Sequence, residues 1–141
     1  MTRVEFYIFG ETTPGDRLGL ACRLSQKAVE RGRTLHIHAA GEEQARLLDE
    51  RLWTFRPESF VPHALAGSDE AEASPVVIGH GADPDGPHDV LINLAGEVPP
   101  FFSRYERVIE IVDHDAEQKL RARDHYRFYR DRGYPLTDHR L

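Results

Sequence analysis

The 141-residue sequence has very few residues that could cross-link or anchor it. Cys22 is the only cysteine, so an intrachain disulfide is impossible and a cysteine-based zinc site is not expected. No stretch approaches the ~18 consecutive apolar residues of a membrane-spanning helix. The first residues have the pattern of a strand and lack the apolar core of a secretory signal. These absences predict a cytoplasmic protein without a membrane partner.

The sequence also lacks the glycine-rich loops that bind nucleotides. Gly10 and Gly15 have the spacing of a phosphate-binding loop, but Asp16 and Arg17 stand where that motif needs Lys and then Ser or Thr. Asp16 is better interpreted as the N-cap of the helix that follows. The dinucleotide pattern and the G-x-S-x-G nucleophile elbow are absent as well. A small nucleotide-dependent α/β enzyme that uses the loop from Gly10 to Gly15 remains an alternative.

Few residues could bind a metal or act as a nucleophile. His36 and His38 alternate along one predicted strand and therefore share a face, but no nearby set supplies the remaining ligands of zinc. We interpret both as surface or strand-end histidines. Cys22 lies on the apolar side of a predicted helix and is interpreted as a core residue. No cofactor, metal or catalytic site is predicted.

Strand-like and helix-like segments alternate along the chain. Five apolar, β-branched segments predict strands at residues 3–9, 34–39, 75–78, 89–94 and 107–112. Apolar spacing predicts helices at residues 16–31, 41–53 and 115–132. Residues 55–65 are rich in large apolar groups without a clear period and are predicted as a loop or short helical turn. The alternation predicts one three-layer α/β domain over residues 1–141, with a mostly parallel five-stranded sheet and helices on both faces.

Charge is unevenly distributed along the chain. The formal net charge is -6, yet residues 119–132 hold six basic side chains and two acids. The net charge of this segment is therefore +4, and that of the rest of the chain is -10. A local basic stripe on an acidic protein favours a specific acidic partner. Direct binding of single-stranded nucleic acid through this segment is a further alternative, although the acidic remainder would repel the backbone.

Two features favour binding to other proteins. The first is the segment from Trp53 to His63, because aromatic side chains outside regular elements are typical interface anchors. The second is the last predicted helix, in which an aromatic face (Ala122, Tyr126, Tyr129 and Gly133) lies beside a basic arc (Lys119, Arg123, Arg127 and Arg130). Such a pair of stripes can bind a carboxylate and a neighbouring apolar side chain together.

The chain resembles the chi subunits of bacterial DNA polymerase III over nearly its whole length. The most specific match is residues 57–63 (PESFVPH) together with residues 48–53 (LDERLW). Further matches are residues 6–7 (FY), 75–76 (PV), 89–94 (DVLINL), 110–113 (EIVD), 119–123 (KLRAR), and Tyr126 and Tyr129 through to Gly133. The resemblance implies a Rossmann-like domain that binds no nucleotide and has no catalytic site.

The resemblance also implies two partners. Chi-like proteins connect the psi subunit of the clamp loader to the acidic C-terminal tail of single-stranded DNA-binding protein, which ends in an apolar residue and its free carboxylate. Nucleic acid is thus contacted only indirectly. The stretch with Trp53, Phe60, Pro62 and His63 corresponds to the psi surface, for which a repair helicase can compete.

The tail-binding residues are expected on and beside the last helix. By the resemblance, Lys119 and Arg123 hold the carboxylate and acidic groups of the tail. Arginine can bind a terminal carboxylate through two parallel hydrogen bonds, which favours Arg123 as the main contact. Val112 and Leu120 are candidates for the pocket of the terminal apolar side chain, and Arg127 and Arg130 for longer-range attraction.

Overall fold

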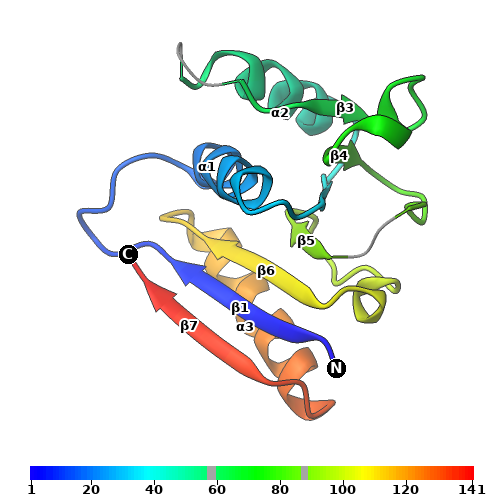
Figure 1. The fold of residues 1–141 in the computed structure, drawn as a ribbon. Helices are drawn as coiled ribbons and strands as arrows, with labels where there is room; N and C mark the ends of the chain where they lie inside the picture. Colours follow the sequence, from blue (N-terminus) through cyan, green and yellow to red (C-terminus); the bar gives the residue numbers. More distant parts are fainter. Residues whose placement is uncertain (57–59, 87–88) are drawn as a thin grey trace.

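The computed structural model describes residues 1–56, 60–86 and 89–141. These residues form one sheet of seven strands in the order β3-β4-β2-β5-β6-β1-β7 (Figure 1). All of its strand pairs are parallel. The strands are β1 (Arg3–Ile8), β2 (Leu35–His38), β3 (His63–Leu65), β4 (Val76–Gly79), β5 (Val90–Asn93), β6 (Arg107–Val112) and β7 (Leu136–Arg140).

Three α-helices and two short 3-10 helices complete the fold. The helices are α1 (Arg17–Glu30), α2 (Glu42–Thr54), η1 (Ala71–Ala73), η2 (Phe102–Arg104) and α3 (Ala116–Asp131). α1 and α2 cover one face of the sheet, and α3 crosses the other (Figure 1). This arrangement confirms the predicted three-layer α/β fold. None of the helices in the described residues is long and apolar enough to cross a bilayer.

The sheet separates two hydrophobic clusters, and strand alternation decides which side chain joins which cluster. In β6, Ile109 and Ile111 belong to the cluster under α1 and α2, whereas Val108 and Val112 belong to the cluster under α3. Glu110 lies two residues from both Val108 and Val112 and therefore also faces α3. A charged residue is thus placed in the layer between the sheet and α3.

The strand count of the prediction was too low, because the two edge strands were missed. β3 lies within residues 55–65, which were predicted as a loop or helical turn; with three residues it is too short to show a period. β7 follows Pro135 directly and is mostly exposed and polar, so it lacks the apolar run of a buried strand. Proline at the start of an edge strand is compatible with the sheet because no ladder hydrogen bond is lost there.

The prediction of surface or strand-end histidines was wrong about the surface, although His38 is the last residue of β2. His36 and His38 are both buried, because β2 lies between β4 and β5 and is covered on both faces. The ring of His38 packs edge-on against Phe101 with centroids 5.1 Å apart, and burial lowers the pKa of His38. The prediction for Cys22 is confirmed: it is fully buried, and burial raises the pKa of its thiol to about 11.

Candidate functional site

The ends of α3 are determined by local interactions. Asp115 is the N-cap, and its side chain accepts a hydrogen bond from the backbone N–H of Glu117 at 3.0 Å. The helix ends at Asp131, and Gly133 follows with a positive φ of 79°. Gly133 therefore lies beyond the helix and does not extend the aromatic face predicted for it. The chain then turns directly into β7.

A buried polar network fixes α3 on the sheet. The Glu110 carboxylate, 5% exposed, accepts a hydrogen bond from the Tyr129 hydroxyl at 2.7 Å and one from the Asn93 amide at 3.0 Å. It also accepts one from His125 Nδ1 at 2.9 Å, while His125 Nε2 donates to the Gly96 carbonyl at 2.8 Å. Three donors, two from α3 and one from β5, thus converge on a single acid of β6, which fixes the rotation of α3 about its axis.

The two partners of His125 suit a ring that donates from both nitrogens. A backbone carbonyl can only accept, so Nε2 carries a proton, and the carboxylate at Nδ1 likewise accepts. Burial disfavours the charged imidazolium, but the hydrogen bond and the negative charge of Glu110 outweigh it and raise the pKa of His125. When the imidazole is protonated, His125 and Glu110 form a buried ion pair.

We expect this ion pair to make stability fall as the pH rises. In the unfolded chain the pKa of histidine is about 6.5. A raised pKa in the folded protein means that the stabilisation is complete below that value and is lost as the pH rises through the folded pKa. Urea unfolding at pH values between about 6 and 8 measures this slope in the free energy of unfolding, below the range in which cysteine titrates.

Glu110→Gln is the matched variant for this measurement. A glutamine amide can accept from Tyr129 and Asn93 and donate to neutral His125, so it keeps the hydrogen bonds without the charge. The decline in stability with pH should disappear in this variant. An equal decline in both proteins would show that His125 is not the group responsible.

The outward side of α3 carries the basic stripe. Lys119 and Arg123 are one helical turn apart and exposed, and their side chains make no ion pair or hydrogen bond with any residue in the described part of the chain. Arg127 lies 3.7 Å from Asp124, and Arg130 lies 3.1 Å from Asp131. We call Lys119, Leu120, Arg123, Arg127 and Arg130 the α3 cationic surface. Within it, Lys119 and Arg123 are the two cations without an acidic neighbour.

The apolar candidates lie in different places. Leu120 is 59% exposed on the α3 cationic surface, whereas Val112 is buried at the end of β6 in the cluster beneath α3. Tyr129 is fully buried, but Tyr126 is half-buried, with its ring centroid 5.2 Å from that of Phe6. Tyr126 flanks Lys119 and Arg123 on the helical wheel, so it offers an aromatic edge beside the unpaired cations.

A second surface lies where α2 ends. Leu48 and Leu52 face the core, while Trp53 is 57% exposed and Phe60 is 63% exposed, with ring centroids 5.3 Å apart. We call Trp53, Phe60 and the half-buried Pro62 the aromatic surface. Residues 57–59, which belong to the same matched stretch, lie outside the described residues.

His63 supports the aromatic surface from beneath. Its buried ring meets the Trp53 ring edge-on at 4.9 Å. Its two nitrogens lie 2.7 Å from the Val61 carbonyl and 3.2 Å from a carboxylate oxygen of Asp49. His63 thus fixes the position of Trp53, and its side chain is not itself part of the exposed surface.

The loop from Gly10 to Gly15 is not available to a nucleotide phosphate. Asp16 caps α1 as predicted, accepting from the Gly19 N–H at 2.9 Å. Arg51 of α2 donates to both oxygens of the same carboxylate, at 2.6 and 3.0 Å, and this hydrogen bonding lowers the pKa of Asp16. The Asp16 carboxylate therefore already occupies the N-terminus of α1, where a phosphate would bind. Arg51 is hydrogen-bonded to the same carboxylate.

Known proteins resemble this chain over nearly its whole length. The family model described as "DNA polymerase III chi subunit, HolC" matches residues 1–137. The chain belongs to the DNA polymerase III chi subunit family. It is 49% identical to DNA polymerase III subunit chi of Pseudomonas aeruginosa over 141 residues, covering 100% of this chain and 98% of the relative. The same subunit of Haemophilus influenzae is 34% identical over 134 residues (94% and 93% of the two chains), and that of Escherichia coli 32% over 142 (97% of each).

Membership of the chi family confirms the resemblance drawn from the sequence. It also confirms the predicted role in DNA replication as an accessory subunit that is not itself an enzyme. Sequence reasoning selected Lys119, Arg123 and Trp53, whose side chains are exposed in the structure, but it missed Glu110 and His125. The available signal was an acid inside the apolar run of β6, since a buried charge needs a partner.

Proposed function

We propose that this chi-family chain connects the clamp loader of DNA polymerase III to single-stranded DNA-binding protein. The α3 cationic surface binds the acidic C-terminal tail of the latter, and the aromatic surface binds the psi subunit. The chain acts in the cytoplasm at the replication fork and contacts DNA through these partners. The family membership supports the replication role, and the two exposed surfaces support the two partners.

The observation that carries the tail proposal is the pair of unpaired cations on α3. Exposed lysines and arginines on this helix otherwise have acidic neighbours, as Arg121 has Glu117 at 3.0 Å. Lys119 and Arg123 have none among the described residues and lie on one face of the helix. Two such cations on a chain with a net charge of -6 attract an acidic peptide locally without attracting polyanions in general.

The chemistry of the surface suits a peptide that ends in an apolar residue. Arg123 donates two parallel hydrogen bonds to the terminal carboxylate, and Lys119 adds a second charge. The half-buried Tyr126 and the exposed Leu120 border these cations and offer apolar contacts to the terminal side chain. Val112 contributes from beneath, at the end of β6. Binding is modest and salt-dependent because a flexible tail loses entropy when it docks.

We expect Arg123→Ala to weaken binding of a tail peptide at least about tenfold, since a hydrogen bond to a charged group contributes about 1.5 to 3 kcal/mol. Isothermal titration calorimetry of the wild type and the variant with a synthetic acidic tail peptide measures the change. Arg123 is exposed and makes no intramolecular pair with a described residue, so the variant keeps its fold; circular dichroism verifies this.

Arg121→Ala is the matched control, because it removes the same charge from the same helix. If Arg123 recognises the carboxylate, Arg121→Ala weakens binding far less, and amidation of the peptide C-terminus weakens it as much as Arg123→Ala does. Equal losses in the two variants would reduce the effect to general attraction. Absence of binding by the folded wild type at low salt would remove the tail proposal.

The psi proposal depends on the aromatic surface. Two large aromatic side chains, each more than half exposed and stacked near one another, are unusual on a protein surface unless a partner covers them. Trp53 and Phe60 form the exposed part, Pro62 borders them, and His63 holds Trp53 from below. A repair helicase that presents a similar apolar surface competes for the same residues.

A further inference from the structure

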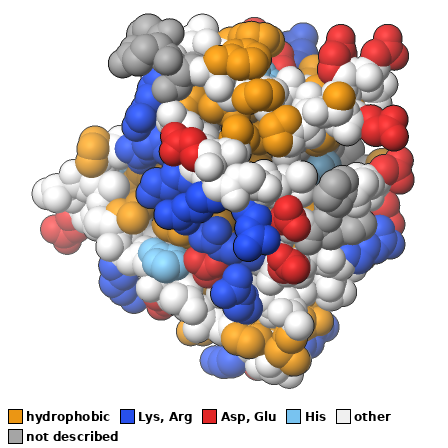
Figure 2. All heavy atoms as spheres, viewed as in Figure 1, with side chains coloured by type: hydrophobic (Ala, Val, Ile, Leu, Met, Phe, Trp, Pro, Cys, Tyr) orange, Lys and Arg blue, Asp and Glu red, His pale blue; other side chains and the backbone are white. Residues whose placement is uncertain are grey.

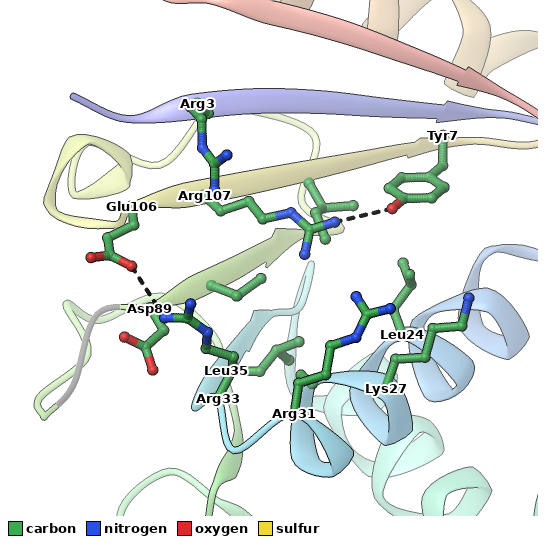
Figure 3. A pocket seen from close by; sticks show the side chains of 13 residues that line it. Arg3, Tyr7, Leu24, Lys27, Arg31, Arg33, Leu35, Asp89, Glu106 and Arg107 are labelled. Atoms are coloured by element: carbon green, nitrogen blue, oxygen red, sulfur yellow. Dashed lines mark hydrogen bonds and ion pairs between the residues drawn. The ribbon is translucent and has the colours of Figure 1, made fainter.

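A third feature lies on the α1 face of the molecule, apart from both surfaces described above. It is a hollow of about 260 Å³ between the C-terminal end of α1 and the first residues of strands β1, β2, β5 and β6 (Figure 3). The N-terminal ends of the strands form it, so it is not the crevice at the carboxyl ends in which open α/β sheets usually bind ligands. Its position follows from the packing of α1 over the sheet.

The walls of the hollow are strongly basic. Five cationic side chains line it, against the two acids Asp89 and Glu106: Arg3, Lys27, Arg31, Arg33 and Arg107. Figure 2 shows basic side chains gathered on this face over the region between α1 and the strands. The local charge of +3 contrasts with -6 for the whole chain. An anion therefore meets a focused positive potential here.

Three of these cations are available to a ligand. Arg33 lies 3.7 Å from Glu106, and Arg107 is held by the Glu5 carboxylate. The side chains of Arg3, Lys27 and Arg31 make no ion pair or hydrogen bond with any residue of the described ranges. Figure 3 shows Lys27 and Arg31 extending from α1 toward the strands and toward Arg107 and Tyr7.

The strand side of the hollow is rigid and offers a further donor. Tyr7 accepts a hydrogen bond from Arg107 Nη2 at 3.1 Å, so its own proton remains for an incoming acceptor. The Tyr7 ring stacks on His139 with centroids 4.5 Å apart, and His139 Nε2 lies 2.8 Å from Glu5. Burial raises the pKa of Tyr7, so the hydroxyl stays protonated.

The base of the hollow is apolar and can contact an apolar group. The C-terminal end of α1, which borders the hollow, has the carbonyls of Lys27, Ala28 and Val29 already hydrogen-bonded, so these do not repel an anion. Leu24, Leu35 and Ile109 line the base and are buried. The last carbonyls of α1 are already bonded: Arg31 N–H to Lys27, Gly32 N–H to Val29 and Arg33 N–H to Ala28, at 2.8 to 3.1 Å. The site therefore combines cationic walls with an aliphatic base.

We propose that this hollow binds a phosphate monoester, with the phosphate near Lys27, Arg31 and the Tyr7 hydroxyl and the attached group over the aliphatic base. A compact dianion with three oxygens can accept hydrogen bonds from these three side chains, and Figure 3 shows Lys27 and Arg31 extending toward Tyr7. The volume lies just below the ~300 Å³ at which pockets for drug-sized ligands begin, which suits the phosphate and part of the attached group. An extended acidic peptide fits less well, because Asp89 and Glu106 stand at the rim.

A phosphate monoester occurs on a free mononucleotide and at the 5′ end of a DNA strand, and titrations distinguish these sources. We expect AMP to bind saturably and adenosine to bind at least about tenfold more weakly, since charge-assisted hydrogen bonds are lost. A 5′-phosphorylated tetranucleotide that binds better than its 5′-hydroxyl counterpart indicates a strand end; binding of AMP alone indicates a free nucleotide. Backbone amide shifts in NMR spectra should map AMP to residues around Lys27 and Arg31.

Lys27→Gln combined with Arg31→Gln should weaken AMP binding at least about tenfold. Both side chains are exposed and unpaired with any described residue, so the fold is retained. Arg23→Gln combined with Arg46→Gln removes the same charge from exposed positions outside the hollow and should leave binding unchanged, as should Arg123→Ala. The proposal is overturned if wild type does not saturate, if both double variants weaken AMP equally, or if a glutamate-rich peptide of equal charge binds more tightly than AMP.

Discussion

Replacing Glu110 with leucine is expected to lower the free energy of unfolding by about 3 to 5 kcal/mol, the usual cost of removing one partner from a buried ion pair. Glu110 is the shared acceptor of His125, Tyr129 and Asn93. Leucine has a similar size but no acceptor, so three buried donors lose their partner and His125 loses its counter-charge. Denaturant unfolding of the variant and wild type at pH 6 to 7 gives the difference.

The control for this prediction is Glu117→Leu. Glu117 makes an exposed ion pair with Arg121, four residues later on α3, and such pairs contribute about 0.5 kcal/mol or less. A loss below about 1 kcal/mol in Glu110→Leu would lie within the range of ordinary surface substitutions. It would mean that the network does not anchor α3, and the position of the α3 cationic surface would then need another explanation.

Trp53→Ala is expected to weaken binding of the psi subunit by about 2 to 4 kcal/mol, or roughly 30- to 1,000-fold. The proposed partner covers an indole that is 57% exposed and lies 5.3 Å from the Phe60 ring. Because Trp53 is the only tryptophan, its fluorescence reports on the contact directly. A shift of the wild-type emission to shorter wavelength on addition of psi measures burial, and titration calorimetry compares the affinities of variant and wild type.

Leu47→Ala serves as the matched variant on α2. Leu47 is also an exposed apolar side chain of this helix, 45% exposed, but it is not part of the aromatic surface. If the aromatic surface is the psi site, Leu47→Ala leaves the affinity within about threefold of wild type, the usual scale of a surface substitution. Unchanged affinity in Trp53→Ala, or an equal loss in both variants, would assign psi to another part of the molecule.

Local patterns were sufficient to predict most of the fold. The apolar runs of β5 and β6 indicated buried strands, and the spacing of Ala45, Leu48 and Leu52 indicated the face of α2 that is indeed buried. The edge strands were missed for two physical reasons: β3 has only three residues and shows no period, and the mostly exposed β7 needs no apolar run. β2 was predicted as a strand, but the burial of its two histidines depends on neighbours that only the topology supplies.

The functional surfaces were predictable only in part. Lys119, Arg123 and Trp53 stand out in the sequence, because charge clustering and rare aromatics are local signals. The aromatic face of α3 was less accurate: Tyr129 is buried in the Glu110 network, and only Tyr126 borders the cations. The basic hollow could not be found at all, since Arg3, Lys27 and Arg31 come together only when α1 packs on the sheet.

The sheet stands between the α3 cationic surface and the aromatic surface, each of which belongs to a helix packed on its own hydrophobic cluster (Figure 1). Ligands bound on the two sides of the sheet lie apart, and if neither surface changes the other, their binding free energies add without cooperativity. A chain attached at one surface nevertheless meets the second ligand at an effective concentration set by tether length and not by abundance. Two modest contacts then multiply into a durable attachment, while each can dissociate and re-form by itself.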